Sequence, residues 1–359
     1  MMLTTLTTLT GLSLLPLAPG TATDSIAPFV QINSQSYAEN NSIYALVKGK
    51  ESDYQGSNHA FTFNEAAFGL RYHNVTLSYL YRYEWFLKHS PDALLLYGDS
   101  LNRTDMVPGK TYQVDLNVNH TIQQGIRLGW RMEPADNLAF YVAGSYLKAT
   151  DLMEGQLHGQ VQRSASDDIS GQLNLDYVYG EDVLLDRIAD KPTSRYGFST
   201  DLGFDWHINR YWFLSAFVQD VYGEIMWDRA PYTTAVANTA TAETDENGYI
   251  NINPIASGFE GYKEYKQRLT PKYTGRLAYL LGDTALSASH FYGYGAQLTD
   301  LAVSHGWSWI SARLSYTLQS QAIGLALTHR YWSMQVVSDN LDYQQASQLT
   351  VMLSGQVPF

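Results

Sequence analysis

Four side chains that could make a hydrolytic site lie close together in the sequence: Ser199, Asp201, Asp205 and His207. Their positions differ by even numbers, so all four share one face of an extended strand. His207 would serve as a base and Asp205 would orient it. Neighbours on one face are ~7 Å apart, however, and His207 lies at a tight turn, where polar residues are common. The pattern keeps a hydrolase only as an alternative to a protein that is not an enzyme.

Metal and cofactor chemistry has less support. The nine histidines show neither HExxH nor H-x-x-x-H spacing, and the chain has no cysteine. This argues against a zinc site and a disulfide scaffold. No glycine-rich phosphate loop occurs, and the acidic stretch ETDENG at 243–248 lacks the full spacing of a calcium loop. We therefore expect no metal and no cofactor.

A larger set of charged side chains lies on the polar face of alternating segments. Among them are seven arginines: Arg71, Arg82, Arg127, Arg131, Arg276, Arg313 and Arg330. Acidic residues occupy the same face at Asp115, Asp176, Asp201 and Asp205. In a barrel the arginines would form one basic wall of the lumen, roughly opposite the last three aspartates, and would set ion selectivity. The alternative is that they pair with Glu84, Asp115 and Glu133 and brace the wall.

The elements that must position these charges are long alternating segments. In VTLSYLYRYEWFLK at 75–88, every odd position is apolar or aromatic and most even positions are polar. From Tyr112 to Met132 one phase is kept for about twenty residues, whereas an ordinary globular strand has about five or six. Tilted strands that cross and extend beyond a bilayer would have this length. We therefore expect the apolar face to meet lipid rather than a protein core.

Composition agrees with such a barrel. The mean hydropathy of the 359 residues is -0.24, and beyond the leader no run of about 18 uncharged apolar residues predicts a helical span. Aromatic residues make up 13% of the chain and charged residues only 16%, a mix that suits aromatic girdles. The formal net charge of -12, without any basic run, argues against nucleic acid as a partner.

Tight turns and longer connections separate the segments. Tight turns are expected at 73–74, 134–137, 207–210, 282–283 and 319–321, and longer connections at 89–110, 180–194, 225–268, 298–307 and 338–347. Placing both termini in the periplasm puts the tight turns there and the long loops outside. This predicts an all-β, antiparallel up-and-down barrel of about 14 strands. Sixteen strands result if ALLLYG at 93–98 is a strand and 112–132 is split, and 12 is the lower alternative.

The chain resembles a Gram-negative outer-membrane β-barrel in its leader, its alternating strands, its turn asymmetry and its terminal QLTVMLSGQVPF. Residues 1–22 are expected to be a signal peptide, although no lysine or arginine precedes Lys48, and 23–359 a single barrel domain with a long loop at 225–268. Phe359 resembles the signal read by the barrel-assembly machinery. The resemblance implies location in the outer membrane, with its lipid and lipopolysaccharide as surroundings.

Function is less specified than architecture. The first hypothesis is a channel through which small hydrophilic solutes pass passively along a charged lumen. The second is the barrel component of an export, assembly or surface-attachment system, with a narrow or plugged lumen and an envelope protein as partner. The outer-membrane hydrolase is the third. The 225–268 segment would be a constriction or plug in the lumen, or an external lid or mobile loop.

Overall fold

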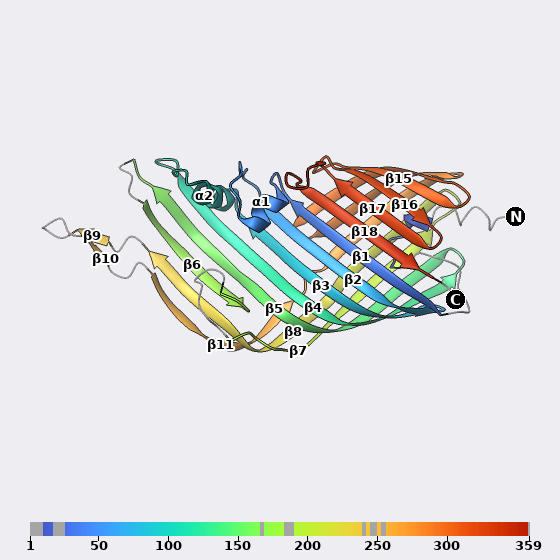
Figure 1. Cartoon of the computed structure of the whole chain (residues 1–359), viewed down its shortest axis with the longest axis horizontal. Helices are drawn as coiled ribbons and strands as arrows, with labels where there is room; N and C mark the ends of the chain where they lie inside the picture. The colour runs from blue at the N-terminus through green and yellow to red at the C-terminus, as the bar shows by residue number, and fades with distance from the viewer. Residues whose placement is uncertain are drawn as a thin grey trace.

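The computed structural model describes residues 10–16, 26–165, 169–182, 190–238, 242–244, 250–252 and 256–357. Its strands form one antiparallel sheet that closes into a barrel (Figure 1). The first strand, β1 (Ala27–Ala38), pairs with the last, β18 (Gln348–Gln356), over a register from Phe29 opposite Gln356 to Tyr37 opposite Gln348. Closure satisfies backbone groups that no water could reach inside a bilayer.

The sheet contains sixteen strands but only fourteen positions around the barrel. β6 and β7 pair in succession with β5, and β11 and β12 pair in succession with β8, so each pair shares one position. The predicted strand number of about 14 is confirmed. The remaining strands of this sheet are β2 (His59–Tyr72), β3 (Val75–His89), β4 (Thr111–Ala135), β5 (Leu138–Arg163), β6 (Ile169–Tyr179), β7 (Ser194–His207), β8 (Trp212–Asn238), β11 (Ala256–Arg268), β12 (Lys272–Leu281), β13 (Thr284–Gly293), β14 (Ala296–Gly306), β15 (Ile310–Thr317), β16 (Ile323–His329) and β17 (Trp332–Ser338).

The apolar face of the strands points outward. On β3, Val75, Leu77 and Tyr81 are 42%, 52% and 48% exposed, whereas Leu80 and Arg82 on the opposite face of the strand are fully buried. The same outward exposure recurs around the barrel, from Phe68 on β2 to Leu314 on β15. An exposed apolar surface of this extent is typical of a membrane-facing one. The period-2 pattern was therefore interpreted correctly as to direction: the apolar side of the strands faces outward, and no second sheet of the described residues covers it.

Three short helical elements accompany the strands: η1 (Thr10–Leu12), α1 (Ile43–Lys48) and α2 (Pro91–Asn102). The Ser90 hydroxyl caps α2 by accepting from the Ala93 N–H, and Pro91 suits the first helical position. ALLLYG at 93–98 lies in α2, so the strand on which the sixteen-strand alternative depended does not form. No helix in the described part of the chain is long and apolar enough to cross a membrane.

The first and last described segments, residues 10–16 and the end of β18, lie at one end of the barrel, on the right in Figure 1. We call it the periplasmic end, because outer-membrane barrels have short periplasmic turns. Predicted turns at 73–74, 134–137, 207–210 and 282–283 are at this end. The predicted turn at 319–321 is at the opposite, outer end, where Tyr294 and Gly295 make a further tight turn. The separation of short turns from long loops is therefore incomplete.

Two of the predicted long connections, 225–268 and 298–307, were wrong. Most of 225–268 is strand, because β8 continues to Asn238 and pairs with β11 from Ala256. Residues 298–307 belong mainly to β14, which the Tyr294 turn separates from β13. The predicted connection at 180–194 is confirmed, since β6 ends at Tyr179 and β7 begins at Ser194, but it links two strands that run in the same direction along β5.

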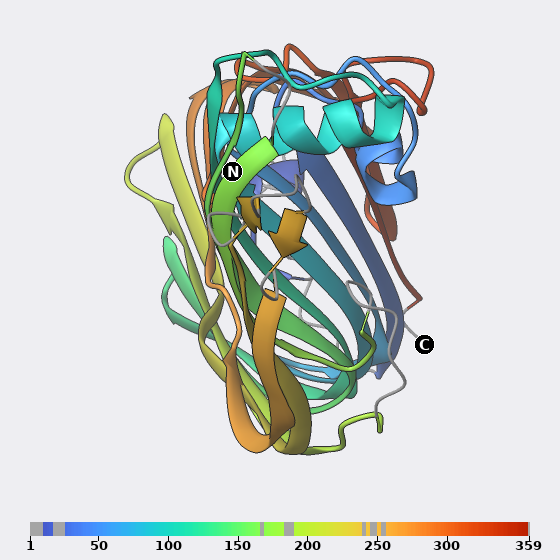
Figure 2. The ribbon, with the colours of Figure 1, turned by 90° about the vertical axis from the view of Figure 1, so that its left-hand side faces the viewer.

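The barrel wall is much taller on one side. β4, β5 and β8 contain 25, 26 and 27 residues, whereas β16 and β17 contain seven each. A tilted transmembrane strand needs only about 9–11 residues, so the tall wall extends well beyond the bilayer. Figures 1 and 2 show this extension, built from β4, β5, β6, β8 and β11, at the outer end. Between β8 and β11 lie the two short strands β9 (Ala242–Thr244) and β10 (Ile250–Ile252).

Candidate functional site in the barrel lumen

Buried charges cross the lumen at mid-height. We call this set the central ion network: Glu65 on β2, Arg82 and Glu84 on β3, Arg127 on β4, Asp201 on β7, Asp220 on β8 and Lys272 on β12. Alternation brings each side chain inward, since every second residue of a barrel strand faces the lumen. The network contains three cations and four carboxylates. It therefore joins the walls through mutual neutralisation and leaves little free charge at this height.

Glu65 holds the two arginines of the neighbouring strands together. Its Oε2 accepts from Arg82 Nη2 and Arg127 Nη2, both at 2.8 Å, and its Oε1 accepts from Arg127 Nη1 at 2.9 Å. The Nε2 of Gln219 on β8 donates to the same carboxylate at 3.0 Å. Because charge-assisted bonds between Arg and carboxylate are among the stronger ones in proteins, Glu65 fixes the orientation of both guanidinium groups.

Asp220 and Lys272 extend the network to the other wall. Arg82 Nη1 is 3.0 Å from both carboxylate oxygens of Asp220, and Lys272 Nζ donates to the same carboxylate. Lys272 Nζ also lies 3.3 Å from Glu84 Oε1. Since β12 and β3 are not neighbours in the sheet, this ion pair crosses the lumen directly.

An irregularity in β8 gives Asp220 its position. Its φ is 54°, which is uncommon for a residue other than glycine, and the β7–β8 register shifts between Thr200 and Leu202. The Asp220 N–H donates to Asp201 Oδ1 at 2.9 Å, and the Ser199 hydroxyl donates to the Asp220 carboxylate. These bonds satisfy polar groups that leave the ladder at the bulge.

The β13–β14 turn closes the lumen above the network. Tyr294 and Gly295 have φ values of 57° and 80°, as a tight type I′ hairpin turn requires. The turn leans inward, so the Tyr294 hydroxyl donates to Glu84 Oε2 at 3.0 Å and its ring lies 5.1 Å from that of Phe61 and 5.3 Å from that of Phe86. An aromatic contact between β2, β3 and this turn therefore fills the space across the barrel.

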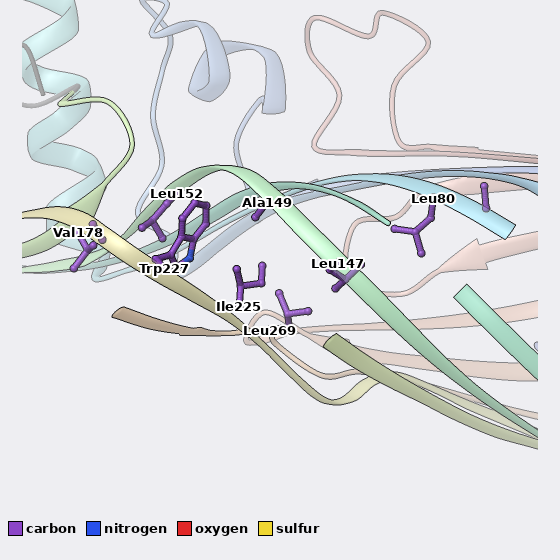
Figure 3. Close-up of a cluster of buried hydrophobic side chains, with 10 residues drawn as sticks. Leu80, Leu147, Ala149, Leu152, Val178, Ile225, Trp227 and Leu269 are labelled. Atoms are coloured by element: carbon purple, nitrogen blue, oxygen red, sulfur yellow. The ribbon is translucent and has the colours of Figure 1, made fainter. Parts of the chain in front are cut away.

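Besides the central ion network and the Tyr294 turn, a cluster of apolar side chains also plugs the lumen. Figure 3 shows the apolar lumen cluster, whose side chains come from β3, β5, β6 and β8 and from the turn before β12: Leu80, Leu147, Ala149, Leu152, Val178, Ile225, Trp227 and Leu269. Trp227 and Ile225 are fully buried. Within the described residues, inward apolar side chains fill this part of the barrel and leave no open passage through it. The expectation of an open lumen is not met in this state.

Below these plugs lies a cavity of about 790 Å³, which we call the periplasmic cavity. Its lining combines aromatic residues, including Phe217, Phe291 and Trp307, with charged ones, including Arg276 and Arg313. Residues 11–16 of the N-terminal segment form part of the wall and reach into the barrel. The Ser13 hydroxyl donates to Asp205 at 2.7 Å, and Leu12 packs against Phe213 and Ala278. These residues belong to the expected leader, whose removal stays a prediction.

The predicted basic wall separates into groups with different surroundings. Arg82 and Arg127 brace the central ion network, as the bracing alternative expected. At the periplasmic end, Arg131 pairs with Glu133 and Asp205, and Arg71 Nε donates to the carbonyl of His73. Arg330 is exposed in the β16–β17 turn, over the ring of Tyr331, and not in the barrel wall. Arg276 and Arg313 are buried beside the periplasmic cavity.

The predicted acidic group also separates. Asp201 and Asp205 are buried and lie 3.3 Å from Arg127 and 3.5 Å from Arg131, so they are next to the arginines and not opposite them. Asp115 pairs with His158 near the outer end of β4, where both are exposed, and Asp176 is exposed on β6. The prediction of a field between two opposite charged walls was therefore wrong. Phe359 lies outside the described residues.

The candidate hydrolytic group is not assembled. Ser199 donates to Asp220, while Asp205 accepts from Ser215 at 2.6 Å and from Ser13. The His207 ring lies against Phe213, and no hydrogen bond in the described part of the chain joins it to Ser199 or Asp205. Without a base in contact with a nucleophile, these residues do not form a catalytic site.

Sequence reasoning missed Glu65, Asp220 and Lys272, the residues that connect the walls. Glu65 is a charged residue within HAFTFNEAAFGL, and Asp220 interrupts the apolar stretch AFVQDVYG. A buried charge inside an otherwise apolar strand is a usable signal, because such a charge requires a partner. Lys272 follows Pro271 at the start of its strand and offers no comparable signal.

No family model and no curated protein matches this sequence. Several solved structures show some likeness in fold. The toluene transporter TbuX of Ralstonia pickettii has 7% identity and a TM-score of 0.42, with 95% of this chain and 91% of that chain covered. The toluene transporter TodX of Pseudomonas putida has 8% identity and a TM-score of 0.44, with 97% of this chain and 94% of that chain covered. A FadL homologue of Pseudomonas aeruginosa has 10% identity and a TM-score of 0.40, with 96% of this chain and 92% of that chain covered.

The closed sheet and its outward apolar belt together establish the class of protein. The chain forms a closed β-barrel of the outer-membrane type with fourteen strand positions, and described side chains fill its lumen at mid-height.

Proposed function

We propose that this protein is an outer-membrane channel for small solutes that is closed in the state described here. The observation that carries the proposal is the nature of the closure. Among the described residues, side chains and one two-residue turn fill the middle of the lumen, rather than a separate folded domain. Rotamer changes and small loop movements occur on fast timescales, so a closure of this kind opens without unfolding the barrel.

The solutes are expected to be small and to carry polar groups. The lumen wall presents the buried charges of the central ion network, and the periplasmic cavity adds Arg276 and Arg313 beside Phe217 and Phe291. A fully hydrophilic porin would need a continuous wetted path, which the apolar lumen cluster interrupts. The proposal is therefore a gated passage for small polar solutes and not a permanently open pore.

Single-channel recording in a planar bilayer tests this function. The full chain would be compared with Lys272→Ala, which removes the ion pair that crosses the lumen, and with Lys266→Ala as a matched control. Lys266 pairs with Glu224 and is about half exposed, outside the central ion network. We expect rare openings in the wild type and the control, and longer or more frequent openings in Lys272→Ala. A barrel that folds but stays silent in all three forms at every voltage contradicts the channel.

The plugged lumen also favours a second candidate, the barrel component of an export, assembly or surface-attachment system. The tall wall supports it, because Phe259 and Tyr262 on β11 are 65% and 46% exposed beyond the shorter strands. Exposed aromatic residues are common in protein interfaces. Purification from cross-linked envelopes would then recover one envelope protein in fixed proportion, and Phe259→Ser with Tyr262→Ser would reduce its recovery. Recovery of the barrel alone argues against this role.

A further inference from the structure

Arg276 and Arg313 differ from the other buried cations of the lumen. Each is 7% exposed, and in the described part of the chain neither has a carboxylate within ion-pair distance. Arg276 Nε and Arg313 Nη2 both donate to the hydroxyl oxygen of Ser289, at 2.9 Å and 3.2 Å. Two like charges thus meet at one neutral acceptor, whereas Arg82 and Arg127 share Glu65. Asp300 and Asp205 act on these arginines only at longer range, so neither guanidinium group has a carboxylate in direct contact, which is unfavourable for a buried cation.

Unused hydrogen-bond donors lie at the same place. Within the described residues, Arg313 Nε and the hydroxyls of Ser304 and Ser287 are buried and have no hydrogen-bond partner. Ser304 on β14 is the register partner of Arg313 on β15, so their side chains start from adjacent points of the wall. Buried donors of a native protein are normally satisfied. A ligand with several acceptor oxygens would satisfy them and neutralise the two guanidinium groups.

We propose that Arg276, Arg313 and Ser304 form a binding site for an oxyanion group, a carboxylate or a phosphate, of a solute that enters the periplasmic cavity. The carbonyl oxygens of Gly11 and Leu12, each 3.0 Å from Arg276 Nη1, occupy the position that oxygens of the ligand would take. Guanidinium groups match such anions in shape and charge. A role of the site in transport rests on the proposed channel function, but binding itself does not.

The geometry of the cavity allows this ligand. Arg276, Arg313 and Ser304 all line the periplasmic cavity, whose volume of about 790 Å³ is within the range of small-molecule sites. The N-terminal segment covers part of the site through main-chain carbonyls alone, without a charged side chain among residues 11–16. A negatively charged ligand therefore competes with neutral oxygens for Arg276, and the competition favours the ligand.

Calorimetric titration of the full chain, refolded in non-ionic micelles, tests the site. The probes are inorganic phosphate and benzoate, with ionic strength held constant by sodium chloride. We expect saturable binding of one probe, and a loss of at least tenfold in affinity in Arg276→Gln and Arg313→Gln. Arg195→Gln is the matched control, because Arg195 is exposed and pairs with Asp228 and Glu264 outside the cavity. Phosphate binding indicates a free inorganic anion, whereas binding of benzoate alone indicates an organic carboxylate.

The absence of saturable binding to the folded wild type overturns the proposal, as does equal binding by Arg313→Gln. If an arginine variant fails to fold, Ser304→Ala replaces it, with an expected several-fold loss of affinity, and unchanged affinity again overturns the site. Binding is measured without current, so the two proposals fail separately. A conducting barrel that binds neither probe refutes the oxyanion site alone, and a silent barrel that binds one refutes the channel alone.

Discussion

Replacing Glu65 by glutamine tests whether the central ion network stabilises the barrel. Glu65 Oε2 accepts four hydrogen bonds, from Arg82 Nε and Nη2, Arg127 Nη2 and Gln219 Nε2, and Oε1 accepts one from Arg127 Nη1. Glutamine keeps a carbonyl oxygen that can accept the four hydrogen bonds made to Oε2. Its amide nitrogen, however, replaces Oε1 and is itself a donor, so it cannot accept the hydrogen bond from Arg127 Nη1. The negative charge between the two guanidinium groups is lost.

The expected cost follows from burial. Removing one partner of a buried ion pair typically costs about 3–5 kcal/mol, because the remaining charge stays buried without compensation. Arg82 is fully buried and keeps Glu84 and Asp220, but Arg127 keeps only Asp201. We therefore expect Glu65→Gln to lower the free energy of unfolding by about 3 kcal/mol or more. Glu133→Gln removes a carboxylate that is 54% exposed and should cost about 1 kcal/mol or less.

Equilibrium unfolding in guanidinium chloride, followed by tryptophan fluorescence of barrels refolded in lipid vesicles, measures both variants. A shift of the midpoint at unchanged slope reports stability. A loss below 1 kcal/mol in Glu65→Gln, or an equal loss in Glu133→Gln, would refute the view that the network braces the barrel. In that case the ion pairs contribute little to the free energy of unfolding, and little free energy is needed to separate them.

Three further predictions concern packing, lipid contact and pH. Gly125→Ala should destabilise the barrel by about 1–3 kcal/mol, since a Cβ there would lie 2.0 Å from the carbonyl oxygen of Tyr146, whereas Gly275→Ala meets nothing within 4 Å and should be neutral by the same unfolding assay. Leu314→Arg places a charge on the outward-facing side of β15 and should destabilise the folded barrel by about 2–4 kcal/mol, the cost of a charge near the bilayer midplane. Leu341→Arg, in a fully exposed outer loop, is the control and should leave stability unchanged. The heat-modified mobility on a gel measures the folded fraction of both variants. The hydrogen bond from Lys110 lowers the pKa of Asp92. The stabilisation of α2 by the Asp92 carboxylate is therefore present above the ordinary carboxyl pKa and is lost as the pH falls below about 4. Hydrogen exchange in α2 should become faster below that pH in the wild type but not in Asp92→Asn.

The strand architecture was predictable because a local, repeating constraint determines it. Lipid outside and polar groups inside impose a period of two on each strand, and Tyr112–Met132 kept its phase within the single strand β4. Turns and long-range pairing were less predictable. Residues 225–268 contain small polar residues typical of a loop, but pairing between β8 and β11 overrides that local preference. The Tyr294–Gly295 turn was missed because aromatic residues around it continue the strand pattern.

The candidate site was predictable only in part. The alternation correctly predicted that Arg82, Arg127, Arg276 and Arg313 point into the lumen. It contains no information about their partners. Arg127 meets Glu65 from 62 residues away, and Lys272 meets Glu84 from 188 residues away. Such contacts depend on strand tilt and on the bulge at Asp220, which set the height of each side chain in the lumen. The sequence therefore suggested charged walls but not their mutual neutralisation.

The central ion network has a consequence for biogenesis. Its members come from six strands between β2 and β12, so the network is complete only when the eighth of the fourteen strand positions is in place. Contacts of such high sequence separation form late and slowly. A partly assembled or misregistered sheet would hold unpaired charges inside a hydrocarbon layer. Such an intermediate is unfavourable, so its strand pairing would tend to reverse. The complete set of ion pairs therefore requires that strand order and stagger are both correct.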